Sequence, residues 1–221
     1  MAITYDNVSS GTGSAVSPKT VSHTIGSGSN RILVVATQIE NTTEIAITGI
    51  TYNSVAMTKI DHRTSSDTAI MRVELWYILE ANLPSTGAYD ISVTWASAPA
   101  QCIVGGISLA GVAQQAPEAS AGNTVGASDT ITADITTLTN GAWIVDSVGC
   151  GNQGTNYTAN NQTERYDTTV GTTVRGGGST REVVSAGLVT NSWTFSTTAN
   201  RQALFGAAFA PISGGRVIYI T

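Results

Sequence analysis

The stretch Met71-Arg-Val-Glu-Leu-Trp-Tyr-Ile-Leu79 decides the fold class of this chain. Its apolar side chains alternate with Arg72 and Glu74, and the stretch Tyr89-Asp-Ile-Ser-Val-Thr-Trp95 repeats the same period of two. A period of two places alternate side chains on opposite faces of a β-strand, so each stretch predicts a strand with one buried face. A proline and a glycine interrupt the pattern between them. We therefore expect two neighbouring antiparallel strands.

The same alternation runs through most of the chain, and no window of ten residues has a convincing helical period. Further strands are predicted at residues 2–8, 20–25, 31–39, 45–52, 55–60, 102–109, 130–135, 142–150, 182–190, 192–196 and 202–210. Two of these segments, 31–39 and 142–148, are partly apolar on both faces, which is typical of central strands that are covered on both sides. Short strands without helices between them predict an all-β protein, an antiparallel β-sandwich of the jelly-roll type.

The domain organisation is predicted as one β-sandwich over residues 1–210, followed by a hinge and a C-terminal arm over residues 211–221. Two segments, 111–128 and 151–179, are interpreted as long loops because they are rich in glycine and alanine or contain a run of three glycines. A domain boundary near residue 115 is the alternative. The apolar arm either closes the sheet of its own domain or adds a strand to a neighbouring subunit.

Composition excludes some classes of partner. The 221 residues carry a net charge of −5 and include 33 threonines and 22 serines, with lysine only at Lys19 and Lys59. No basic tract is available to neutralise phosphates, so we expect no nucleic-acid partner. The longest apolar run, residues 32–36, is much shorter than the ~20 residues of a membrane helix, and the first ten residues lack the pattern of a secretory signal. We expect no membrane partner and no export.

The histidines and cysteines are predicted to be structural. His23 shares the parity of apolar neighbours in its strand, which favours a buried role over a ligand role. His62 lies in the segment 61–67, which we interpret as a polar connection; an arginine there opposes cation binding, so no metal is predicted. Cys102 and Cys150 are expected to be buried thiols, although a bond between them stays open.

Catalysis is not supported by any motif in the chain. No nucleophile elbow and no phosphate-binding loop are present. Asp146 is a carboxylate on an inward face, where a hydrogen-bonded structural group is more common than a catalytic acid, whereas Glu74 and Asp134 lie on faces predicted to be polar. We therefore predict that the protein is not an enzyme and needs no cofactor.

One tryptophan is a candidate for binding. Trp95 and Trp193 share the parity of core residues, whereas Trp76 lies on the same face as Arg72 and Glu74. An aromatic ring on a solvent face can stack on a sugar or lie in a subunit interface. We therefore interpret Trp76 as a glycan-binding or interface residue.

The order of the elements resembles a β-sandwich module of tailed-bacteriophage structural proteins and of some large bacterial surface proteins. The segments that carry this resemblance are Asn-Arg-Ile-Leu-Val-Val-Ala at 30–36, Ile-Thr-Gly-Ile-Thr-Tyr-Asn at 47–53 leading into 57–59, 73–79, 87–95 and 107–112. The resemblance covers about residues 30–210. It implies a structural role in a virion or at a cell surface and brings no catalytic residues. A single copy without repeats favours the phage form.

The resemblance leads us to expect a bacteriophage virion protein that decorates or cements the capsid. Such a protein is expected to form a homotrimer, to bind the major capsid protein or another virion protein, and to reside in the virion after assembly in the host cytoplasm. The expected contacts are edge strands, loops and the arm, with anchors at Arg216, Val217, Ile218, Tyr219 and Ile220. Deletion of residues 214–221 is expected to leave a folded chain that no longer docks. The alternative is a tail-fibre, receptor-binding or carbohydrate-binding module that uses Trp76.

Overall fold

The alternating stretches form strands, and every strand pair that the structure describes is antiparallel. The structure is a computed structural model that describes residues 1–66, 69–151, 156–171 and 174–213. In these ranges the only helix is η1 (Glu80–Asn82), a single 3-10 turn. The prediction of an all-β, sandwich-like fold is confirmed, and its jelly-roll detail stays a prediction.

The strands form four sheets. Sheet A has the order β1 (Thr4–Gly13), β9 (Gln101–Ala110), β3 (Ile32–Asn41), β7 (Ile70–Leu79), β6 (Thr58–Ser66). Sheet B has the order β2 (Lys19–Ile25), β8 (Gly87–Trp95), β4 (Ile47–Tyr52), β5 (Val55–Ala56). Sheet C has the order β10 (Ala119–Val125), β16 (Gly187–Phe209), β12 (Ala142–Gly151), β15 (Val174–Val183), β14 (Thr163–Val170). Sheet D consists of β11 (Ser128–Thr137) and β13 (Tyr157–Asn160) on either side of the first part of β16.

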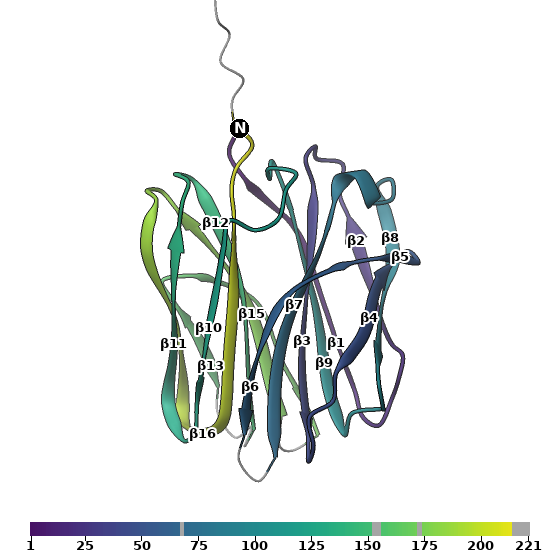
Figure 1. Ribbon diagram of the computed structural model, residues 1–221, viewed down its shortest axis with the longest axis vertical. Coiled ribbons are helices and arrows are strands. Elements are labelled where there is room, and N and C mark those ends of the chain that lie inside the picture. The colour runs from purple at the N-terminus through teal and green to yellow at the C-terminus, as the bar shows by residue number, and fades with distance from the viewer. Residues whose placement is uncertain (67–68, 152–155, 172–173, 214–221) are drawn as a thin grey trace, which may run out of the picture.

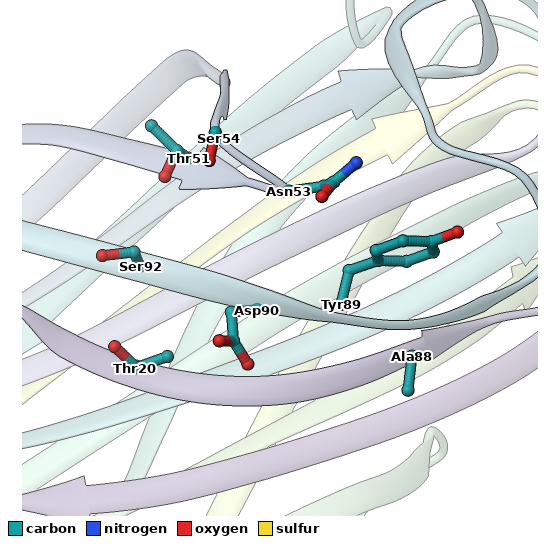
Figure 2. A pocket seen from close by; sticks show the side chains of 8 residues that line it. All are labelled: Thr20, Thr51, Asn53, Ser54, Ala88, Tyr89, Asp90 and Ser92. Atoms are coloured by element: carbon teal, nitrogen blue, oxygen red, sulfur yellow. The ribbon is translucent and has the colours of Figure 1, made fainter.

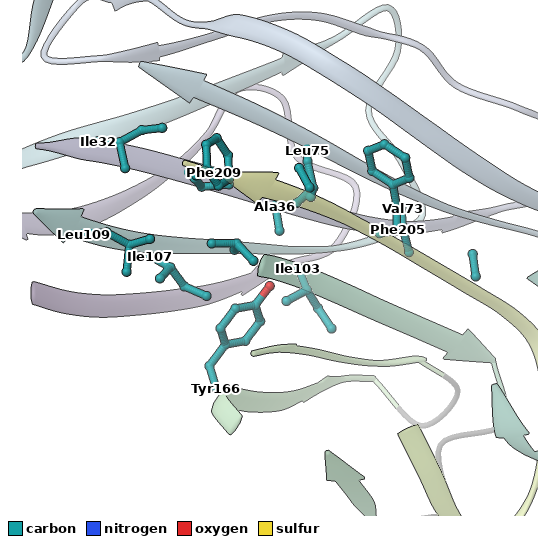
Figure 3. Close-up of a cluster of buried hydrophobic side chains, with 14 of the residues drawn as sticks. Ile32, Ala36, Val73, Leu75, Ile103, Ile107, Leu109, Tyr166, Phe205 and Phe209 are labelled. Atoms are coloured by element: carbon teal, nitrogen blue, oxygen red, sulfur yellow. The ribbon is translucent and has the colours of Figure 1, made fainter. Parts of the chain in front are cut away.

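These sheets stack as four layers in the order B, A, C, D, from β5 and β8 on one side to β11 on the other (Figure 1). One apolar cluster fills the space between sheets B and A, and another fills the space between A and C (Figure 3). Two smaller clusters lie between C and D. The central strands of sheets A and C are therefore buried on both faces.

The two central strands predicted to be covered on both sides lie in these inner sheets. In β3, Leu33 belongs to the cluster toward sheet B and Val34 to the cluster toward sheet C. In β12, Val145 faces sheet A, whereas Ile144 and Val148 face sheet D. Because successive residues of a strand point to opposite faces, a strand between two cores needs apolar residues at both parities. This prediction is confirmed.

The strand β7 differs from its prediction. It was expected to have one buried face and to pair with β8, but β7 lies in sheet A between β3 and β6, whereas β8 lies in sheet B. The connection that contains η1 carries the chain from one sheet to the other. Both faces of β7 are therefore covered, because sheet C packs on one face and the edge of sheet B approaches the other.

Three predicted strands between residues 182 and 210 are organised differently. Val183 ends β15, residues 184–186 connect the strands, and Gly187–Phe209 form the single strand β16 of 23 residues. The first part of β16 pairs in sheet D and its last part in sheet C. The pairing with β12 is irregular near Asn200, and Arg201 has a φ of 50°, so β16 changes sheets at a local bulge.

The segments interpreted as long loops contain strands, so that interpretation is wrong. Residues 111–128 include β10, and residues 151–179 include β13, β14 and the start of β15. The glycines of β15 allow a close approach: a Cβ on Gly178 would lie 2.3 Å from Cε1 of Tyr166. Between sheets A and C, the Gln38 amide donates to the Tyr166 hydroxyl at 2.8 Å and also to the Ser147 hydroxyl. The glycines thus make room for a buried polar contact.

The strand pairing divides near residue 112. In the described ranges, β1 to β9 pair among themselves, as do β10 to β16, and one isolated bridge links Val112 to Pro211. The apolar cluster between sheets A and C nevertheless draws side chains from both halves. The single domain over residues 1–210 stays a prediction, which the unfolding behaviour of the chain can test.

Candidate functional site

The buried carboxylate Asp146 accepts hydrogen bonds from several side chains. Ser179 Oγ donates to it at 2.6 Å, Asn191 Nδ2 at 2.9 Å and Trp193 Nε1 at 3.3 Å. Burial raises the pKa of Asp146, although these donors act in the opposite direction. Ser179 lies in β15, and Asn191 and Trp193 lie in β16, so Asp146 links sheets C and D, and the prediction of a hydrogen-bonded inward carboxylate is confirmed.

The polar face predicted for β7 is buried in an ionic network. Glu74 is fully buried, and it accepts hydrogen bonds from Arg72 Nη2 at 2.6 Å and from Trp76 Nε1 at 2.8 Å. Lys59 Nζ on β6 lies 3.0 Å from the same carboxylate, and Arg72 also pairs with Glu44. The assumption that this face points to solvent is therefore wrong, because the network covers sheet A next to the edge of sheet B.

This network also changes the place of Trp76. Its indole is half-buried, packs against the cluster between sheets A and B, and donates to the buried carboxylate of Glu74. An open stacking platform would need a ring face that is free on the solvent side. The burial of Trp76 therefore weighs against the sugar-stacking role that the sequence suggested, and an interface role stays a prediction. Trp95 and Trp193 are buried, as their parity predicted.

His23 is buried in a chain of hydrogen bonds between β1, β2 and β9. Its Nδ1 lies 2.9 Å from Ser9 Oγ and its Nε2 lies 3.1 Å from Ser108 Oγ, which donates to Asp6 at 2.7 Å. Burial lowers the pKa of His23 to about 4, although the charge of Asp6 opposes the shift. A serine next to a histidine is one element of a nucleophilic site, but an imidazole of such low basicity is a weak proton acceptor at neutral pH. The arrangement agrees with the structural role predicted for His23.

The remaining candidate ligands stay apart. His62 lies in β6, so residues 61–66 continue a strand where a connection was predicted; its Nδ1 is 3.3 Å from Asp61 Oδ1. Cys102 and Cys150 are buried free thiols, which confirms the expectation of two buried thiols. Burial raises the pKa of each thiol to about 11. Among the residues that the structure describes, no three histidine, cysteine, aspartate or glutamate side chains gather as a metal site.

A polar groove lies on the outer face of sheet B (Figure 2). Its volume is about 470 Å³, and its lining residues come from β2, β4, β8 and the turn between β4 and β5. Strand register builds it: Ser92 pairs with Thr20 on one side and with Thr51 on the other, so three hydroxyl side chains form a row across three strands. The other lining residues are Asn53, Ser54, Ala88, Tyr89 and Asp90.

The pattern of the sequence does not predict this groove. The alternation in residues 89–95 places Asp90 and Ser92 on the outer face, as predicted. Their neighbours on β2 and β4 depend on which strands pair in sheet B, and the alternation itself contains no information about that. The one indication of the groove in the sequence is the number of hydroxyl and amide side chains at outward positions of these strands.

A second surface feature is an apolar patch at one end of the second half, which we call the apical patch and define as Leu138, Val184 and Leu188. These side chains are 68%, 77% and 69% exposed. They come from adjacent segments, because Thr137 pairs with Gly187 and the Gly141 amide donates to the Val184 carbonyl at 3.3 Å. Exposed apolar side chains that gather at one place are typical of a protein contact surface.

The predicted anchors at the C-terminus, Arg216 to Ile220, lie outside the described residues. The structure does describe the start of the predicted hinge. Pro211 bridges Val112, and the Ile212 amide donates to the Gly111 carbonyl at 3.0 Å. Residues 211 and 212 are thus tied to the body of the protein.

Comparison with protein-family models, with curated proteins and with solved structures finds no match to this chain. The resemblance to phage structural modules therefore stays a prediction. No helix in the described part of the chain is long and apolar enough to cross a membrane.

Proposed function

We propose that this protein is a structural component of a bacteriophage virion, a decoration protein that attaches to the outer surface of the capsid. The fold supports this proposal because the central strands of its inner sheets are buried on both faces, which makes a body with little freedom to rearrange. The resemblance of the strand order to phage structural modules is the second support.

The apical patch is the observation that carries the proposal. Its loops are held by hydrogen bonds, including one from the Ala186 amide to Asn140 Oδ1 at 2.8 Å and one from the Leu138 amide to Glu118 Oε1 at 2.9 Å. The apolar side chains are therefore presented in a fixed arrangement while they remain in water. Their burial against a capsid protein would remove apolar area from water, which favours attachment.

We further propose that the protein attaches as a homotrimer and is added to the capsid in the host cytoplasm. Decoration of a particle repeats the same contact at symmetric positions, and a closed symmetric oligomer suits such positions. Light scattering of the purified protein measures this state directly: a mass of about three times 22.8 kDa is expected, and a monomer mass would contradict the trimer.

Analysis of purified virions tests the function. Mass spectrometry should detect the chain in the particles, and three-dimensional imaging should place four-layer β-sandwiches on their surface. Absence of the chain from virions that are otherwise complete would refute the proposal.

Substitution of the patch tests the attachment surface. A chain with Leu138→Asp, Val184→Asp and Leu188→Asp should fold but fail to incorporate, because three carboxylates would have to be buried in the contact. The matched control is Val55→Asp, which changes an exposed apolar residue of sheet B and should incorporate normally. Equal incorporation of both chains would contradict attachment through the apical patch.

A further inference from the structure

The groove on the outer face of sheet B gathers hydrogen-bonding side chains that the fold does not use. In the described ranges, the side chains of six of its lining residues make no hydrogen bond or ion pair with the protein: Thr20, Thr51, Asn53, Ser54, Asp90 and Ser92. Elsewhere in the chain, exposed polar groups commonly find partners, as when the Thr190 hydroxyl donates to Asp134 at 2.6 Å. We propose that this groove is a binding site for a neutral carbohydrate.

The charge of the groove selects against anionic ligands. Among the residues that the structure describes, Asp90 is the one charged residue that lines the groove, and no lysine or arginine lines it. A phosphate, a sulfate or an acidic sugar would therefore meet a carboxylate without a compensating cation, which is unfavourable. A carboxylate accepts hydrogen bonds at both oxygens, so it suits the adjacent hydroxyl groups of a neutral sugar.

The other lining groups complete this chemistry. The row of Thr20, Ser92 and Thr51 offers hydroxyls that both donate and accept, and the Asn53 amide does the same at the end of β4. Tyr89 has the inward parity of β8, so its ring lies on the core side of the strand and borders the groove only at its end. The ring packs edge-on against Tyr52 with centroids 5.9 Å apart, and its hydroxyl lies 3.1 Å from Ser85 Oγ, so it anchors the strand that carries Asp90 and Ser92.

The turn between β4 and β5 gives an independent indication that the groove is used. Asn53 and Ser54 both have a positive φ, of 49° and 66°. Asparagine and glycine are favoured in such a turn, whereas serine at the second position carries backbone strain. A strained residue is expected where its side chain has a role, and the Ser54 side chain lines the groove.

The dimensions agree with a short oligosaccharide. A volume of about 470 Å³ lies within the range of roughly 300–1,000 Å³ that small-ligand sites occupy. The site is distinct from Trp76, which lies on sheet A. It is also distinct from the apical patch, so binding of sugar and attachment to a capsid can be tested separately.

Binding of the purified chain to an array of neutral and acidic oligosaccharides tests the proposal, followed by titration calorimetry with the best neutral sugar. Wild-type protein should bind neutral sugars, and Asp90→Ala should weaken the affinity at least about tenfold because it removes the charged acceptor. Ser54→Gly should also weaken binding while keeping or raising the melting temperature, since glycine adopts a positive φ without strain.

The matched control is Thr94→Val, which changes an outward hydroxyl of β8 that does not line the groove and should leave the affinity unchanged. The proposal is overturned if no neutral sugar binds at millimolar concentration, if only acidic sugars bind, or if Asp90→Ala and Ser54→Gly bind as the wild type does. None of these outcomes bears on the presence of the chain in virions.

Discussion

Replacement of Phe205 by alanine should destabilise both halves of the chain together. Phe205 lies on β16 in the second half, is fully buried, and belongs to the cluster that joins sheets A and C. The guanidinium of Arg63 on β6, in the first half, lies 5.1 Å from the centre of its ring. Phe205 is therefore a direct test of whether the shared core makes the two halves one cooperative unit.

The expected loss is about 3–5 kcal/mol, the usual cost of replacing a buried phenylalanine by alanine, because the apolar transfer energy is lost and a cavity remains. A domain is typically stable by only 5–15 kcal/mol, so this loss is a large fraction of the total. With a urea dependence of about 2–3 kcal/mol per molar, the unfolding midpoint should fall by about 1–2 M.

Tryptophan fluorescence can follow each half separately, since Trp76 and Trp95 lie in the first half and Trp143 and Trp193 in the second. Two reporter chains are made, each keeping one pair of tryptophans and carrying phenylalanine at the other two positions. Phe205→Ala should lower the midpoint equally in both. As a control, Leu188→Ala changes an exposed residue of the same strand and should alter stability by less than about 0.5 kcal/mol.

A shift confined to the reporter with Trp143 and Trp193 would refute this reasoning. Two separate transitions in the unmutated reporters would lead to the same conclusion. Either result would mean that the chain has two independent domains with a boundary near residue 112, in spite of the apolar cluster between them.

Three further predictions concern buried groups. Glu74→Gln should lower stability by about 3–5 kcal/mol in urea unfolding, because Arg72 loses its buried counter-charge; an effect below 1 kcal/mol would show that the network is well solvated. The pKa of His23 is lowered to about 4 by burial, so the unfolded chain binds the proton more readily and stability should fall by roughly 3 kcal/mol as pH drops from about 6.5 to 4. His23→Gln should flatten this dependence, and an unchanged pH profile would contradict it. Gly105→Ala would place a Cβ 2.2 Å from Cζ of Tyr166, so it should lower the melting temperature, whereas a neutral result would mean that the ring moves freely.

The class of fold and the position of most strands could be predicted because alternation is a local property. The segment 89–95 shows this clearly: its outward residues and inward residues in β8 are those that the alternation assigned. The pairing of strands could not be predicted in the same way. The stretches 71–79 and 89–95, in β7 and β8, belong to different sheets, because a short connection is compatible with a hairpin and also with a crossing between layers.

The glycine-rich segments were misjudged for a related reason. Glycine is a common residue of turns, and the run at 176–178 was interpreted in that sense. In β15, Gly177 lies opposite the Trp193 ring and Gly178 opposite the Tyr166 ring, where a side chain would be crowded. The need for that space comes from rings on other strands, so local sequence cannot distinguish this use of glycine from a turn.

In the candidate sites, too, the direction of a side chain can be predicted from the sequence, whereas its neighbours cannot. Alternation along the chain is enough to direct Asp146 and His23 inward and Asp90 and Ser92 outward, and to require a core on each side of β3 and β12. Tertiary packing sets the burial of Glu74 with Arg72, the row of Thr20, Ser92 and Thr51 across three strands, and the adjacent segments that form the apical patch. The physical reason is that the period of a strand sets the direction of each side chain, whereas its neighbours are set by pairing and packing between segments far apart in the chain.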